Sequence, residues 1–89
     1  MDTKQLLLII NPISGTGNKQ GLAELVTERM AKIGYTTEVE YTKGRGDATA
    51  LAKSAINRGF TGVLAAGGDG TVNETATALC NSDTALGII

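Results

Sequence analysis

The sequence contains no histidine and no tryptophan, and it has one proline and one cysteine among its 89 residues. Because Cys80 is the only thiol and no imidazole is present, an internal disulfide, a cysteine–histidine zinc cluster and a cysteine–histidine catalytic pair are all excluded. A lone cysteine is typical of proteins that stay in a reducing compartment, so we expect a cytoplasmic protein.

Neither an excess of one charge nor a long apolar run is present. Eight lysines and arginines nearly balance nine acidic residues, for a net charge of -1, which gives no electrostatic support for nucleic-acid binding. The apolar run at residues 6–10 is too short for a signal-peptide core, and nowhere do roughly 18 apolar residues follow one another. Any membrane contact is therefore expected to be peripheral.

Short apolar runs indicate the strands of one small α/β domain. Residues 6–10, 63–66 and 86–89 are almost continuously apolar, as in strands that are buried on both faces of a parallel sheet. Residues 36–42 alternate more and predict a less buried strand near an edge. A chain of this length is short for a complete two-substrate kinase or dehydrogenase.

Apolar residues at helical spacing fill the intervals between these runs. We expect Asp47 to cap the second helix, and Gly34 and Gly59 to end the first and second. The order βαβαβαβ predicts a three-layer fold with a mainly parallel sheet. The expected buried stripes are Leu22, Leu25, Val26, Met30 and Ile33; Ala48, Leu51, Ala52, Ala55 and Ile56; and Val72, Ala76, Leu79 and Cys80.

The most informative motif is Gly-Gly-Asp-Gly-Thr-Val-Asn-Glu at residues 67–74, between a predicted strand and a predicted helix. Glycines let a ligand approach the main chain, and the free amides at a helix N-terminus favour an anion. A carboxylate at Asp69 would repel bare phosphate, so its position indicates Mg²⁺-nucleotide. The alternative is a tight turn in which Asp69 only caps the helix.

Two further polar loops follow predicted strands at the same edge of the sheet. The first, residues 11–18, contains Pro12, two hydroxyl residues and two glycines, and by itself fits a phosphate loop and a plain turn equally well. The second starts at Thr42 and carries Lys43 and Arg45, which can contact phosphate or simply be solvated.

Two common nucleotide motifs fit less well. No Walker A sequence is present, which excludes ordinary P-loop chemistry. Gly15, Gly17 and Gly21, with Glu40 near the end of the second strand, form a loosened dinucleotide fingerprint. That interpretation leaves the motif at residues 67–74 without a role.

Three motifs together resemble the catalytic domain of the diacylglycerol kinase family. They are Asn-Pro-x-Ser-Gly at residues 11–15, Thr42 with Gly-Asp-Ala at 46–48, and the motif at 67–74. The Gly-Gly-Asp-Gly-Thr core is shared with NAD kinases, whereas the continuation Val-Asn-Glu is most similar to bacterial diacylglycerol and lipid kinases. In that family a strand like residues 86–89 leads into a further conserved segment, so the resemblance implies a truncated N-terminal domain, residues 1–89, of the NAD kinase/diacylglycerol kinase-like fold.

The resemblance implies transfer of the γ-phosphate of ATP to a lipid hydroxyl, such as that of diacylglycerol, with Mg²⁺ as the metal cofactor. Asp69 is the implied catalytic and metal-binding residue. The implied nucleotide-binding residues are Asn11, Pro12, Ile13, Ser14, Gly15, Thr42, Gly68, Asp69, Gly70, Thr71, Val72, Asn73 and Glu74.

In that family a second, β-rich domain carries much of the lipid site, so we expect this chain alone to have little or no kinase activity. A non-catalytic nucleotide or phosphate sensor and an NAD kinase-like fragment are the alternatives. The apolar strand at residues 86–89 also predicts an unpaired sheet edge, through which two copies can associate.

Overall fold

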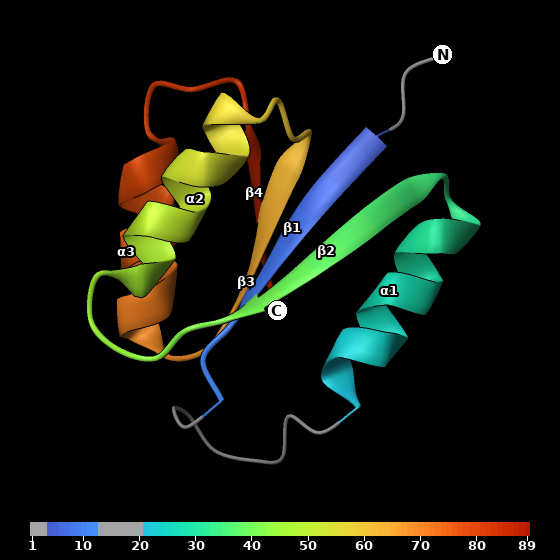
Figure 1. The fold of residues 1–89 in the computed structure, drawn as a ribbon, viewed down its shortest axis with the longest axis horizontal. Coiled ribbons are helices and arrows are strands. Elements are labelled where there is room, and N and C mark those ends of the chain that lie inside the picture. The colour runs from blue at the N-terminus through green and yellow to red at the C-terminus, as the bar shows by residue number, and fades with distance from the viewer. Residues whose placement is uncertain (1–3, 13–20) are drawn as a thin grey trace.

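A computed structural model describes residues 4–12 and 21–89. Over these residues, four strands alternate with three helices, which confirms the predicted βαβαβαβ order (Figure 1). The elements are β1 (Lys4–Ile10), α1 (Leu22–Lys32), β2 (Tyr35–Tyr41), α2 (Asp47–Asn57), β3 (Gly62–Ala66), α3 (Asp69–Leu79) and β4 (Ala85–Ile88).

The strands form one parallel sheet in the order β2-β1-β3-β4. β2 is an edge strand, as its alternating sequence predicted, although it begins and ends one residue earlier than expected. Because all four strands run in the same direction, their carboxyl ends lie at a single edge of the sheet, the usual location of ligand sites in such folds.

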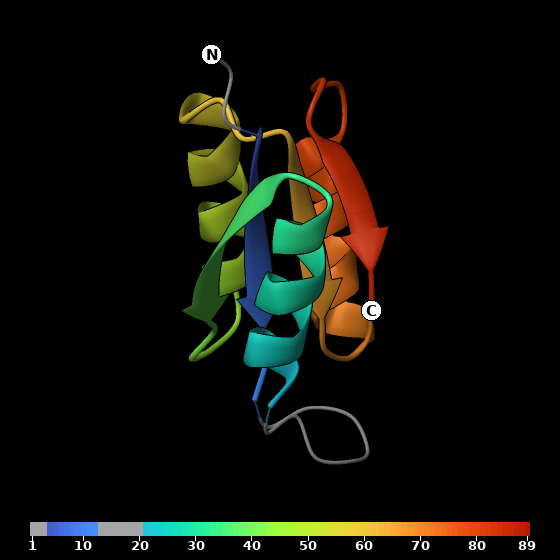
Figure 2. The ribbon, with the colours of Figure 1, turned by 90° about the vertical axis from the view of Figure 1, so that its right-hand side faces the viewer.

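The central strand β1 is buried on both faces, which explains its continuous apolar sequence. Leu7 and Ile9 pack with the residues of α2 and α3, whereas Leu8 and Ile10 pack with Val26 of α1. The result is a three-layer α/β sandwich, with α1 on one face of the sheet and α2 and α3 on the other (Figure 2).

The stripe predicted for α2 is confirmed, because all five residues lie in or against one core cluster. The alanines Ala48, Ala52 and Ala55 are fully buried. Small side chains on this face allow the helix backbone to lie close to the sheet and to α3. The N-terminus of α2 is thereby brought beside α3 at the carboxyl edge.

The stripes predicted for α1 and α3 are partly wrong. Leu25 and Ile33 are 47% and 63% exposed, because α1 meets the sheet along a narrower line and Ile33 lies beyond the last helical residue. Cys80 lies just beyond the end of α3 and is exposed, whereas within α3 Thr71 and Thr75 are buried in addition to Leu79. Thr75 tolerates burial because its hydroxyl donates a hydrogen bond to the Thr71 carbonyl oxygen at 2.8 Å.

The predicted glycine stops are confirmed, since Gly34 and Gly59 follow α1 and α2 with φ angles of 94° and 76°. The prediction that Asp47 caps α2 is wrong. Gly46, with φ 93°, occupies the N-cap position, and Asp47 is the first helical residue. The carboxylate of Asp47 bonds the preceding loop instead of the helix, as described below.

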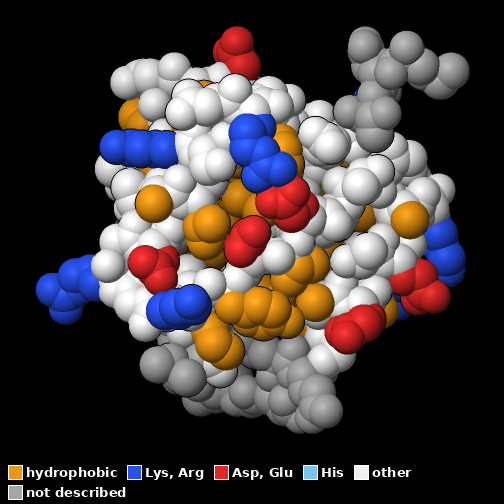
Figure 3. Space-filling view, viewed as in Figure 1, with side chains coloured by type: hydrophobic (Ala, Val, Ile, Leu, Met, Phe, Trp, Pro, Cys, Tyr) orange, Lys and Arg blue, Asp and Glu red, His pale blue; other side chains and the backbone are white. Residues whose placement is uncertain are grey.

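The surface is mixed in charge, with acidic, basic and apolar side chains interspersed on the face that Figure 3 shows. β4 forms the second edge of the sheet, as predicted, and Leu86, Ile88 and Ile89 are exposed there. The prediction that residues 86–89 are buried on both faces is therefore wrong, because β4 has a neighbouring strand on one side only. Within the described ranges, no helix is both long enough and apolar enough to cross a membrane.

Candidate functional site

Backbone hydrogen bonds fix the loops that leave the first three strands at the carboxyl edge of the sheet. The Asn11 amide donates to the Ala66 carbonyl oxygen at 2.9 Å, which holds the exit of β1 against the exit of β3. The Thr42 amide donates to the Ile10 carbonyl oxygen at 2.8 Å, which holds the exit of β2 against β1. Segments that are distant in the sequence therefore meet at one place.

A pocket of about 210 Å³ opens between these loops. The motif at residues 67–74, the first loop and the second loop all contribute to it, as the sequence predicted. Five of the predicted nucleotide-binding residues line the pocket: Asn11, Thr42, Gly70, Thr71 and Glu74.

Other predicted residues lie outside the lining. Pro12, Asp69 and Asn73 are exposed, and Gly68 and Val72 are half-buried. Gly68 and Asp69 nevertheless immediately precede two lining residues, Gly70 and Thr71, at the start of α3. The predicted residues Ile13, Ser14 and Gly15 fall outside the described part of the chain.

The first turn of α3 lines this pocket through Gly70 and Thr71. The first intrahelical bond there joins the Val72 amide to the Gly68 carbonyl oxygen at 3.2 Å. The amides of Asp69, Gly70 and Thr71 have no hydrogen-bond partner within residues 4–12 and 21–89. Unpartnered amides at the positive end of a helix dipole favour an anionic group.

Gly67 is needed because three segments meet closely at the start of this turn. A Cβ atom at this position would lie 2.8 Å from Oγ1 of Thr71 and 3.0 Å from Cβ of Asn11. Real Cβ atoms do not approach neighbours this closely, so any side chain at Gly67 would push α3 and the exit of β1 apart. Thr71 is 6% exposed and lies in this contact.

The loop between β2 and α2, residues 42–46, forms the opposite wall of the pocket. Oδ2 of Asp47 accepts hydrogen bonds from the amides of Lys43, at 2.7 Å, and Gly44, at 3.2 Å. Oε2 of Glu74, from α3, accepts a hydrogen bond from the amide of Gly46 at 2.9 Å. Two carboxylates of the chain itself therefore lie at the N-terminus of α2.

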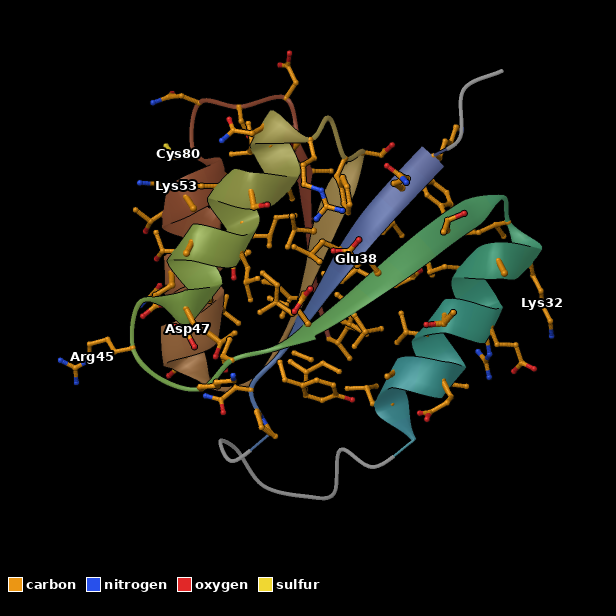
Figure 4. The ribbon with its side chains drawn as sticks, in the orientation of Figure 1. Lys32, Glu38, Arg45, Asp47, Lys53 and Cys80 are labelled. Atoms are coloured by element: carbon orange, nitrogen blue, oxygen red, sulfur yellow. The ribbon has the colours of Figure 1, made fainter. Side chains whose placement is uncertain are left out.

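Three further residues line the pocket without having been assigned to the site: Gly44, Arg45 and Ala48. For Arg45 the sequence left contact with phosphate and simple solvation open, and Ala48 was part of the motif at residues 46–48. Gly44 was signalled only by its position after a strand that ends at the same edge. The Arg45 side chain projects outward from the loop, away from the sheet (Figure 4). In this conformation its guanidinium group is not aimed into the pocket, whereas the loop around it forms part of the wall.

Binding of a metal ion at this site would require a ligand, such as a phosphate group, that supplies further oxygen atoms to the metal. Within the described residues, no group of three or more acidic or cysteine side chains is arranged to hold a metal. Asp69 is exposed at the first position of α3 and supplies a single carboxylate. This set fits Mg²⁺, which proteins often bind through one or two carboxylates together with phosphate oxygens and water.

Three comparisons place the chain among known proteins. The family model for the diacylglycerol kinase catalytic domain matches residues 5–89. The chain is 42% identical to a diacylglycerol kinase of Bacillus subtilis (strain 168), an alignment that covers 97% of this chain and 29% of that protein. It is 36% identical to a diacylglycerol kinase of Staphylococcus haemolyticus, over 92% of this chain and 26% of that protein.

A solved structure has the same fold. The crystal structure of a diacylglycerol kinase from Bacillus anthracis str. Sterne superposes with a TM-score of 0.77 at 28% identity. The superposition covers 98% of this chain and 32% of that one. The chain therefore spans about a third or less of the length of the relatives it matches.

Proposed function

The chain belongs to the diacylglycerol kinase catalytic-domain family, and we propose that it forms the nucleotide-binding part of a lipid kinase. In this proposal, residues 1–89 bind the ATP whose γ-phosphate is transferred to a lipid hydroxyl, such as that of diacylglycerol. One observation carries the proposal. The carboxyl-edge pocket combines polar residues from two loops with the open N-terminus of α3.

The start of α3 is the proposed phosphate site. Within the described residues, the amides of Asp69, Gly70 and Thr71 have no partner, which favours an anion, and the absence of a side chain at Gly70 leaves room for phosphate oxygens beside the main chain. Nothing lies within 4 Å of a Cβ built on Gly70, so space is available there. Thr71 offers a hydroxyl at the same helix end.

The remaining lining residues are assigned to the rest of the nucleotide. Asn11 and Thr42 line the pocket from the ends of β1 and β2, and Glu74 lies one helical turn beyond Gly70. The resemblance assigns Pro12, Ile13, Ser14 and Gly15 to the same first loop, and Val72 and Asn73 to the wall beside α3. These assignments are part of the proposal.

Asp69 is the proposed metal-binding and catalytic residue. Mg²⁺ bound with the nucleotide would neutralise charge on the phosphates during transfer. Phosphoryl transfer depends mainly on positioning and charge stabilisation, which backbone amides, one carboxylate and a metal can supply. The lipid hydroxyl would lose its proton to a base outside the residues assigned here, and its oxygen would bond to the γ-phosphorus while the bond to the β,γ-bridging oxygen breaks and ADP leaves.

The lipid acceptor and the cellular setting belong to the whole protein. We propose a cytoplasmic enzyme that contacts the membrane peripherally to reach a lipid substrate. This chain alone is expected to have little or no kinase activity, and phosphorylation of diacylglycerol by it at the rate of a longer relative would contradict that. The exposed apolar edge at β4 is also a proposed self-association surface, and a monodisperse monomer at high concentration would argue against it.

Binding of Mg²⁺–ATP, measured by isothermal titration calorimetry, tests the nucleotide site. Asp69→Ala should weaken Mg²⁺-dependent binding by about tenfold or more, because it removes the one carboxylate beside the phosphate site. Gly68→Val should abolish binding, since the valine side chain would occupy the turn before α3.

The matched control is Asp83→Ala, the same chemical change at an exposed aspartate before β4, at the opposite edge of the sheet. It should bind Mg²⁺–ATP as the parent does. If Asp69→Ala and Gly68→Val also bind like the parent, the site assignment is wrong.

A further inference from the structure

One carboxylate joins the two walls of the pocket. Glu74 lies on α3, and its Oε2 accepts the hydrogen bond from the Gly46 amide, 28 residues away in the sequence. Gly46 is the N-cap residue of α2 and ends the loop that carries Gly44 and Arg45. The bond therefore fastens the loop wall to the helix wall.

We propose that Glu74 is a positioning residue for nucleotide binding, because it holds the loop between β2 and α2 in the place that shapes the pocket. This inference rests on the nucleotide site proposed above. The residue is not assigned to the chemistry of transfer. Its role is to keep Thr42, Gly44 and Arg45 at a fixed distance from the start of α3.

The loop needs such a fastening because its sequence is permissive. Two of its five residues are glycines, and Gly46 has a φ angle of 93°, in the region where glycine is favoured. The two bonds from Asp47 to Lys43 and Gly44 span four residues or fewer, so they shape the loop without tying it to another element. Glu74 supplies a tie to α3.

A loop fixed before the ligand arrives loses less conformational entropy when the ligand binds. Releasing it should therefore weaken nucleotide binding, even for a nucleotide that makes no contact with Glu74. If Glu74 had a different role, its removal would change the affinity for nucleotide in the opposite direction. If the carboxylate merely lined the pocket, its negative charge would repel a triphosphate, and removing it would strengthen binding.

Three variants separate these roles by titration with Mg²⁺–ATP. Glu74→Ala removes the acceptor and should weaken binding roughly 3- to 10-fold, the range expected for one lost hydrogen bond. Glu74→Gln keeps a carbonyl oxygen that can accept the same bond, and should bind within about twofold of the parent. Glu28→Ala, which removes an exposed carboxylate from α1, should change nothing.

Hydrogen exchange of the Gly46 amide, measured by NMR without nucleotide, tests the fastening separately. Glu74→Ala should speed this exchange by about tenfold or more, with little change in Glu74→Gln. The proposal is overturned if Gly46 exchanges equally fast in all variants, if Glu74→Ala binds ATP as tightly as the parent or more tightly, or if Glu74→Gln loses as much affinity as Glu74→Ala.

The two readouts also distinguish this proposal from the proposed function. Failure of the parent to bind Mg²⁺–ATP would refute the nucleotide site and, with it, the role of Glu74 in nucleotide binding. The exchange measurement would still decide whether Glu74 fastens the loop.

Discussion

The helices α2 and α3 both begin at the carboxyl edge of the sheet, side by side, but their N-termini differ in what already lies there (Figure 1). At α2, the carboxylates of Asp47 and Glu74 accept hydrogen bonds from the amides of Lys43, Gly44 and Gly46. At α3, the amides of Asp69, Gly70 and Thr71 have no partner in the described residues, and neither do the amides of Ala48 and Thr49 at α2. The two helix entries therefore differ in the carboxylates that bond the preceding loop, not in their first helical amides.

The difference shows that a glycine-bearing loop before a helix does not by itself identify an anion site. Both helix entries have glycines, an aspartate in the first turn and a position at the correct edge. The first turns of both helices line the pocket, with Ala48 from α2 and Gly70 and Thr71 from α3. At α2, two carboxylates already bond the loop that leads into the helix, and negative charge there disfavours a further anion. This difference supports the start of α3 as the proposed phosphate site.

The largest expected effect comes from the turn before α3, where the same change at two glycines should have opposite results. Gly67→Ala should destabilise the protein by about 1–3 kcal/mol, because its Cβ would overlap Thr71 and Asn11. Gly70→Ala, a helical position with nothing within 4 Å of the new Cβ, should stabilise it by about 0.4–1 kcal/mol.

Urea unfolding of the parent and both variants measures the two changes in the free energy of unfolding. Equal effects of the same sign would show that the close approach at Gly67 does not define the turn. Gly70→Ala should also weaken Mg²⁺–ATP binding despite its higher stability, since Gly70 lines the pocket. A stabilised variant with reduced binding would separate the site from the fold.

A smaller effect is expected at the entry to α2. Asp47→Ala removes the acceptor of two amide hydrogen bonds and should lower the free energy of unfolding by about 1 kcal/mol. Thermal unfolding measures the loss. Asp47→Asn keeps one acceptor oxygen and should lose less. Were Asp47→Ala as stable as the parent, the loop would not depend on its own carboxylate.

The smallest effect is expected at the other end of α2, where Arg58 donates two hydrogen bonds to Glu38 on β2, at 2.7 and 2.9 Å. These bonds, and the attraction between the two charges, lower the pKa of the Glu38 carboxyl below its usual range. A lowered folded-state pKa stabilises the protein above the unfolded-state pKa, and the contribution disappears as the pH falls through the folded-state pKa.

Glu38→Gln should therefore cost a little stability at neutral pH and nothing in acid below that pKa. The loss is small because both side chains are solvent-exposed. Chemical denaturation at the two pH values measures it, and a difference from the parent that persists in acid would rule out the ion pair as its cause. Nucleotide binding should not change, because Arg58 follows the last residue of α2, Glu38 lies on β2, and neither residue lines the pocket.

Much of the fold could be predicted from local sequence patterns. Continuous apolar runs identified the buried strands β1 and β3, but the same pattern at residues 86–89 belongs to the exposed edge strand β4. Alternation identified the edge strand β2, and Gly34 and Gly59 marked helix ends correctly. Helical periodicity was less reliable at Leu25, Ile33 and Cys80, which are apolar but exposed. Periodicity reports which residues share a helix face, whereas burial depends on how wide a surface the neighbouring layer covers.

The outline of the candidate site could also be predicted from the sequence. Because the strands were expected to be parallel, the loops after β1, β2 and β3 had to lie at one edge, so Asn11, Thr42 and the start of α3 were expected to meet. The assignment of Asp47 as a helix cap was wrong because its carboxylate bonds the preceding loop. Glu74 was expected in the wall, but its bond to Gly46 depends on two helices packing side by side.

The sequence by itself determined the elements, the parallel fold and the family, because these follow from local patterns and motifs. Only the tertiary structure decided that two carboxylates, Asp47 and Glu74, bond the loop at the entry to α2. That arrangement depends on hydrogen bonds between residues far apart in the chain, such as Glu74 and Gly46, and no local pattern encodes their distance.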